Sequence, residues 1–106
     1  MSLNITESYK VAVISTAHVT QSDSEILPQI SFDPLTDRGL NWVHGTEYGW
    51  IVRITHKGSV WKEKLRDYGI TWATIENIEK VLNAGFDAVH FDRDADTIDG
   101  LKSWEW

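Results

Sequence analysis

The chain of 106 residues contains no cysteine, which excludes disulfide bridges, thiolate metal sites, iron–sulfur clusters and a cysteine nucleophile. No apolar run approaches the ~20 residues of a membrane span, and the first residues lack a signal-peptide core. The seven glycines stand singly, so no glycine-rich phosphate loop is present. These absences leave an ordinary globular protein with no membrane partner as the expectation.

Basic side chains are also few. Ten Lys and Arg stand against sixteen Asp and Glu, which gives a formal net charge of −6 and disfavours direct binding of nucleic acid. Hydrophobic residues make up 42% of the chain and charged residues 25%, proportions typical of a folded protein. At this length we expect one domain over residues 1–106.

Local patterns predict strands at five places. The β-branched run at 9–15 is apolar on both faces, which favours a central strand. Segments 40–43 and 48–55 predict a hairpin, 88–91 a short strand and 101–106 a terminal strand. The order of elements predicts an α+β fold with a small mixed or mostly antiparallel sheet.

Capping residues predict the helices. Ser22 begins a short helix in this interpretation. Ser59 and Thr71 cap two longer helices, which end at Gly69 and Gly85 in left-handed turns. We expect these two main helices to pack on one face of the sheet.

The densest polar feature lies near the C-terminus. Residues 87–106 hold six acidic and two basic side chains, a net charge of −4. If the preceding strand continues, His90, Asp92 and Asp94 project to one side and could hold Mg²⁺ or Mn²⁺. The same pattern is typical of a solvated turn in which aspartates cap their own backbone and Arg93 offsets part of the charge. A patch that binds a partner is the third interpretation.

A second polar group follows the first strand, where α/β sheets often bind ligands. Ser15 and His18 are a conceivable nucleophile pair, although no strained turn surrounds Ser15. In the alternative, Ser15 and Thr16 bond loop backbone groups and His18 donates to a carbonyl or carboxylate. If this strand pairs with that of His90, the two histidines and the nearby aspartates line one rim.

Six tryptophans are several-fold more than usual. Trp50, Trp61 and Trp72 fit core positions of predicted strands and helices, whereas Trp42, Trp104 and Trp106 are harder to bury. Aromatic side chains beside an acidic segment are typical of protein interfaces. The alternative for Trp104 and Trp106 is a paired terminal strand whose indoles cover the sheet.

Several short motifs resemble those of a family of small bacterial proteins of unknown function, often carried on plasmids, phages and integrated elements. They are Ser15-Thr16-Ala17-His18, Gly49-Trp50, Phe91-Asp92-Arg93-Asp94, Gly100-Leu101 and Trp106. The resemblance implies no established activity. It implies a cytoplasmic bacterial or mobile-element protein.

We predict a non-enzymatic interaction module whose acidic, tryptophan-bearing face binds a basic protein surface, including the nucleic-acid-binding site of another protein. A mobile-element inhibitor or regulator of a host protein would fit, and it needs no cofactor. The candidate binding residues are Ser15, Thr16, His18, His90, Asp92, Arg93, Asp94, Asp96, Asp99, Trp104 and Trp106. The alternative is a divalent-metal-dependent hydrolase that uses Mg²⁺ or Mn²⁺. Its ligands would be His18, His90, Asp92 and Asp94.

Overall fold

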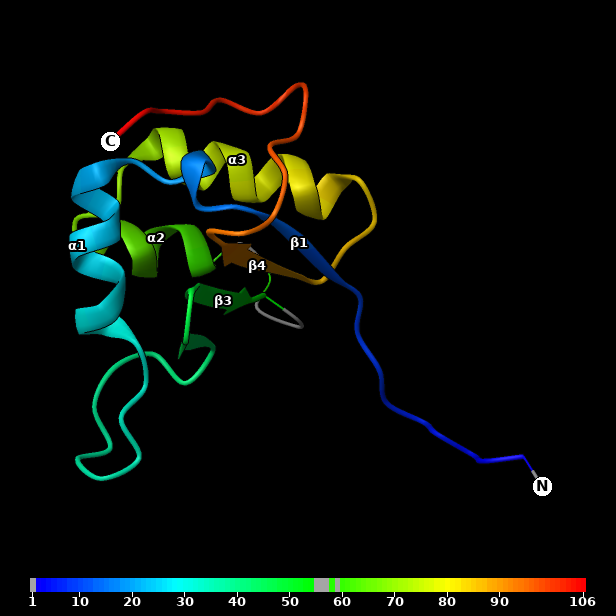
Figure 1. Cartoon of the computed structure of the whole chain (residues 1–106). Coiled ribbons are helices and arrows are strands. Elements are labelled where there is room, and N and C mark those ends of the chain that lie inside the picture. The colour runs from blue at the N-terminus through cyan, green and yellow to red at the C-terminus, as the bar shows by residue number, and fades with distance from the viewer. Residues whose placement is uncertain (1, 55–57, 59) are drawn as a thin grey trace.

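A computed structural model describes residues 2–54, 58 and 60–106 (Figure 1). The elements in chain order are β1 (Val11–Ser15), the 3-10 turn η1 (Thr16–His18), α1 (Gln21–Ile30), β2 (Val43–Thr46), β3 (Gly49–Arg53), α2 (Val60–Asp67), α3 (Trp72–Asn83) and β4 (Ala88–Asp92). The mixture of three α-helices with one sheet confirms the predicted α+β fold.

The four strands form one mixed sheet in the order β1-β4-β3-β2. β1 and β4 are parallel, whereas β4 with β3 and β3 with β2 are antiparallel. β2 and β3 form the predicted hairpin, with bounds moved by a few residues. Parallel pairing brings the carboxyl ends of β1 and β4 to the same end of the sheet, with Ser15 opposite Asp92.

Two strand predictions are wrong. β1 lies at the edge of the sheet, although its two-sided apolar pattern predicted a central position. Residues 101–106 form no strand. This segment runs beside η1, which is helical and offers no regular row of backbone groups to pair with.

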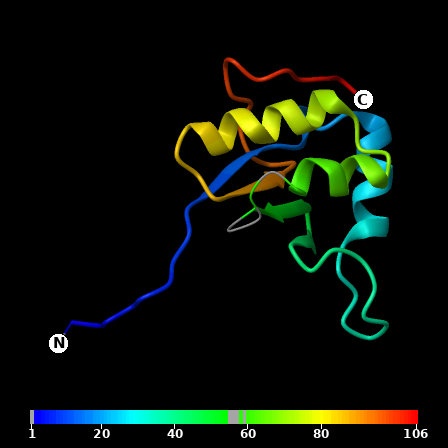
Figure 2. The same cartoon turned by 180° about the vertical axis from the view of Figure 1, so that it is seen from behind.

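The two main helices follow their predicted stop signals. Gly69 ends α2 with a φ of 94°, and the Ile70 N–H donates to Leu65 O at 3.1 Å, the long bond of a Schellman motif. Thr71 caps α3, and Gly85 follows α3 with a φ of 103°. The predicted cap Ser59 and the predicted strand end at 55 lie outside the described residues. Figure 2 shows α2 and α3 side by side.

The helix predicted to be short, α1, instead runs over ten residues and includes Pro28. Thr20, not Ser22, is the N-cap, because the Thr20 hydroxyl accepts the Asp23 N–H at 3.1 Å. Asp23 is fully buried, and its carboxylate accepts hydrogen bonds from the Thr71 N–H and hydroxyl and from the Thr74 hydroxyl. One carboxylate thus ties α1 to the first turn of α3, where the helix dipole favours negative charge.

The core lies between the helices and one face of the sheet. Alternate residues of each strand lie on that face: Ala12, Ile14, Val43, Trp50, Val52, Val89 and Phe91. They pack in one cluster with helix residues such as Leu65 and Ile78. The tryptophan predictions were partly wrong, since Trp42 is buried and Trp72 is exposed. None of the helices described in residues 2–54, 58 and 60–106 has the length and apolar character needed to cross a bilayer.

Candidate functional site

The C-terminal segment, residues 93–106, starts and ends near the end of the sheet where β1 and β4 terminate, and its middle runs back beside β1 (Figure 1). The Ser15 N–H donates to Asp96 O at 3.0 Å, and the Trp104 N–H donates to Ala17 O at 2.8 Å. The indole N–H of Trp106 donates to Val19 O at 2.9 Å. These bonds fasten an irregular segment to the residues that follow β1.

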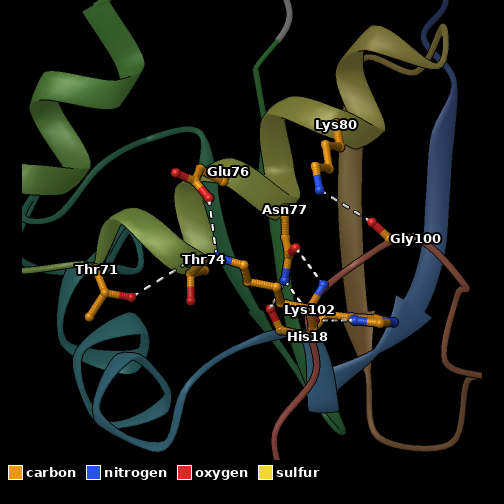
Figure 3. Close-up of polar contacts among 8 residues, drawn as sticks. All are labelled: His18, Thr71, Thr74, Glu76, Asn77, Lys80, Gly100 and Lys102. Atoms are coloured by element: carbon orange, nitrogen blue, oxygen red, sulfur yellow. Dashed lines mark hydrogen bonds and ion pairs between the residues drawn. The ribbon is translucent and has the colours of Figure 1, made fainter.

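His18 and Asn77 fix the middle of the segment, as Figure 3 shows. Both side chains are almost completely buried. His18 Nδ1 donates to Lys102 O at 2.8 Å, and its Nε2 accepts the Ile98 N–H at 2.9 Å. The Asn77 amide nitrogen donates to His18 O and Lys102 O, each at 2.9 Å, while its oxygen accepts the Lys102 N–H at 3.0 Å.

His18 is therefore a structural residue. Both of its ring nitrogens bond backbone groups, so neither is available to a metal ion or to a nucleophile. Ser15 likewise bonds the backbone, because its hydroxyl accepts the Ala17 N–H at 3.0 Å. The nucleophile pair of Ser15 and His18 is wrong, and the part of the alternative in which these two side chains bond backbone groups is confirmed.

The proposed meeting of His18 with the late histidine and aspartates is also wrong. β1 does pair with β4 as predicted, but His90 stands on the sheet face opposite the core, beside Val13 and Ile51. The His18 ring instead lies buried between backbone groups of Ile98 and Lys102. The described residues contain no group of three His, Asp or Glu side chains that could hold a metal ion.

The acidic turn begins as soon as β4 ends. His90 and Asp92 share a face, with His90 Nε2 and Asp92 Oδ2 3.9 Å apart. Asp94 lies beyond the strand, so it does not continue that row; its N–H donates to Asp92 Oδ1 at 2.8 Å. Asp92 thus caps the turn, while Asp94 and Asp96 are exposed and form no ion pair within the described part of the chain.

A groove of about 490 Å³ opens beside this turn, and we call it the aromatic groove. Its walls include Thr16 from η1, Tyr48 and Trp50 from the hairpin, and Arg93 and Trp106 from the C-terminal segment. The Arg93 guanidinium lies 4.6 Å from the centroid of the Tyr48 ring, a cation–π contact. Trp106 remains half exposed at the rim.

Gly49 sets the spacing of the strands that form this groove. A Cβ at this position would lie 1.7 Å from Phe91 O, which is far inside contact distance. Only glycine permits β3 to approach β4 so closely. On β2, a Cβ at Gly45 would meet no atom within 4 Å.

The rim of the aromatic groove is electronegative. A hydrogen bond to Glu47, burial, and the charges of Asp94 and Asp92 raise the pKa of the Tyr48 phenol above its usual value. Glu105 and the two indoles Trp104 and Trp106 line a smaller, adjoining hollow of about 300 Å³ that shares Thr16 with the groove. The carboxylates of this region therefore lie beside aromatic side chains and do not form a cluster of their own.

The structure brings together part of the predicted site. Eight candidates gather at this end of the sheet: Ser15, Thr16, Asp92, Arg93, Asp94, Asp96, Trp104 and Trp106. Asp99 instead lines a separate groove beside β1. Sequence reasoning missed Glu47, Tyr48 and Trp50 as site residues, because Trp50 was given a core position and the other two were considered only as part of the predicted hairpin.

Comparison with known proteins identifies a family for the chain. A family model described as "Family of unknown function (DUF5983) C-terminal domain" matches residues 11–106. Neither the curated proteins nor the solved structures contain a significant match. The match extends over β1 to β4 and the whole C-terminal segment. The chain thus belongs to the family of unknown function DUF5983.

Proposed function

We propose that the protein is a non-enzymatic, cytoplasmic interaction module whose aromatic groove and acidic rim bind a basic surface of another protein. One observation carries this proposal. An open groove with Tyr48, Trp50 and Trp106 in its walls adjoins exposed carboxylates, and no ion pair within the described residues neutralises Asp94 or Glu47. Aromatic anchors in a pocket are the side chains that dominate the energy of protein interfaces.

The groove already holds one guanidinium, because Arg93 stacks on Tyr48. An arginine of the partner finds the same chemistry there: aromatic faces for its planar group and carboxylates for its charge. Arg is enriched at interface hot spots, and its fork of donors suits carboxylates. The favoured partner is therefore an arginine-bearing protein surface, such as one that otherwise binds nucleic acid.

The acidic rim has a kinetic role in this proposal. Exposed carboxylates steer a basic partner toward the groove, and this attraction decays over about 8 Å at physiological ionic strength. The desolvated contact inside the groove responds less to salt. Association should therefore slow steeply with added salt, while dissociation changes less.

The test measures binding of a fluorescein-labelled peptide of nine arginines by fluorescence anisotropy. We expect saturable binding that falls with salt, and no binding of a nine-glutamate peptide. Replacing the two rim carboxylates together, Glu47→Gln with Asp94→Asn, should weaken binding about tenfold or more. Trp106→Ala should do the same without loss of fold, since this residue is half exposed.

A matched control separates a site from general charge attraction. The double variant Glu25→Gln with Glu63→Gln loses the same two charges from exposed positions on α1 and α2. It should bind the arginine peptide nearly as well as the natural sequence. Equal weakening by the two double variants, or unchanged binding by Trp106→Ala, would refute the proposed function.

A further inference from the structure

The outer edge of β1 borders a second groove, which we call the edge groove. It has a volume of about 500 Å³ and runs along Val11 to Ile14. Its other walls are the last turns of α3 and the segment 98–101, and they present mainly apolar side chains, among them Val81, Phe86, Ile98 and Leu101. Within the described residues β1 pairs with β4 alone, so this edge has no partner strand.

Two residues of β1 direct their backbone groups into the edge groove. Lys10 O accepts from the Ala88 N–H on the β4 side, whereas the Ser15 N–H points the other way, to Asp96 O. Because backbone groups alternate sides along a strand, Val11 and Val13 present their N–H and C=O outward. The Val13 side chain is 54% exposed. The edge of β1 thus offers backbone groups that another strand can pair with and apolar side chains that it can cover.

The chain itself carries a segment suited to that edge. Residues 2–9, which we call the arm, are exposed and extend away from the body of the molecule in both views (Figures 1 and 2). Leu3 is 82% exposed and Ile5 is 72% exposed. These apolar residues alternate with the polar Asn4 and Thr6, the period of a strand with one apolar face.

We propose that two copies of the chain form a symmetric dimer in which each arm adds antiparallel to β1 of the other copy. If the alternation of backbone directions in β1 continues into the arm, the odd-numbered residues of the arm direct their N–H and C=O groups toward the partner strand. Pairing Leu3 with Val13 then places Ile5 opposite Val11. Directly opposed residues share a face of the sheet, so these four apolar side chains cover one another on the face that carries His90, while Asn4 and Thr6 turn to the side of the edge groove. A slip of one residue in this register would place the polar Asn4 opposite one of these valines instead.

The arm is better suited to another copy than to its own β1. Folding back would need a tight turn at Glu7-Ser8-Tyr9, which lacks the Gly, Asn or Asp that such hairpin turns favour. An arm of eight extended residues reaches about 27 Å, long enough to run along the five residues of β1. Because the contact is limited to two short strand pairs, the dimer should be weak and reversible.

The first test is the mass of the full chain by light scattering over a concentration series. The mass should rise toward twice 12.1 kDa as concentration increases. Leu3→Asp with Ile5→Asp should keep the mass of one chain at every concentration, with an unchanged melting temperature. The control Leu35→Asp, at a loop residue that is 94% exposed, should still dimerise.

The second test uses the absence of cysteine. A mixture of two single-cysteine variants, Leu3→Cys and Val13→Cys, should oxidise mainly to the mixed dimer rather than to either homodimer. The chain with both substitutions should give an intermolecular disulfide. A chain that stays monomeric up to about 1 mM, a dimer that persists in the double aspartate variant, or a disulfide within one chain would each overturn the proposal.

Discussion

Replacing Asn77 with leucine should release the C-terminal segment while leaving the rest of the fold assembled. Leucine has nearly the shape of asparagine, but it makes none of the three hydrogen bonds of the amide to His18 O and to the Lys102 N–H and C=O. At about 1 kcal/mol for each bond, the folded state should lose about 3 kcal/mol. The amide is buried, so its bonds contribute fully; Lys102 O keeps the bond from His18 Nδ1, whereas His18 O and the Lys102 N–H lose their Asn77 partner.

Two measurements check this prediction. A loss of about 3 kcal/mol in a domain of this size lowers the melting temperature by at least about 10 °C. Hydrogen exchange should accelerate most at the Lys102 and Trp104 amides, because these are the bonds that hold the segment. The amides of β3 and β4 should change less.

Asn83→Leu is the matched control, since Asn83 lies on the same helix and is exposed. It should melt within a few degrees of the natural protein. The opposite result is that Asn77→Leu also melts within a few degrees of the natural protein, with the Lys102 amide still protected from exchange. The Asn77 side chain would then not hold the segment, and the reasoning would fail.

Three further predictions concern strand spacing, a buried carboxylate and pH. Gly49→Ala should cost about 3 kcal/mol in urea unfolding by forcing β3 away from β4, whereas Gly45→Ala should cost less than about 1 kcal/mol; equal effects would contradict the spacing argument. Asp23→Ala should cost about 4 kcal/mol because it leaves three donors at the start of α3 unpaired, one buried and two partly buried, and the exposed Glu25→Ala should be near neutral. Burial, together with the nearby charge of Arg53, lowers the pKa of His44 below its usual 6.5. Below about pH 6.5 the unfolded chain therefore binds more protons than the folded one, and the stability falls as the pH drops. His44→Gln should flatten the melting temperature between pH 7.5 and 5.5, and an identical pH profile would contradict this.

Helix ends were predictable from the sequence because their signals are local. Gly69 and Gly85 supply the left-handed residues that their helix ends need, and Thr71 caps the helix that follows. Each signal acts within a few residues, so it does not depend on the remainder of the fold. Thr20 shows the limit, since Thr20 and Ser22 both suit an N-cap and only the backbone geometry selects one.

Long-range placement was harder to predict. The sequence correctly predicted that β1, which precedes His18, lies beside the strand of His90. It gave no sign that the His18 ring is buried or that His90 lies on the sheet face opposite the core. That difference arises because His18 follows the end of β1, where η1 turns the chain toward Asn77. Strand alternation alone does not specify such a turn.

The error over β1 has a physical origin. Val11 and Val13 make one face of the strand apolar and Ala12 and Ile14 the other, a pattern typical of a strand in the middle of a sheet. In the single chain they lie at an edge, with Val13 more than half exposed. The proposed exchange of arms would cover these side chains and reconcile the pattern with the position.

The central claim, that the aromatic groove is the binding surface, is tested most directly by the indole N–H resonances in an NMR titration with the nine-arginine peptide. We expect the Trp50 and Trp106 signals to shift and saturate with the same dissociation constant, while the signal of the exposed Trp72 on α3 does not shift. Shifts confined to Trp72, or equal small shifts of every indole that never saturate, would contradict it.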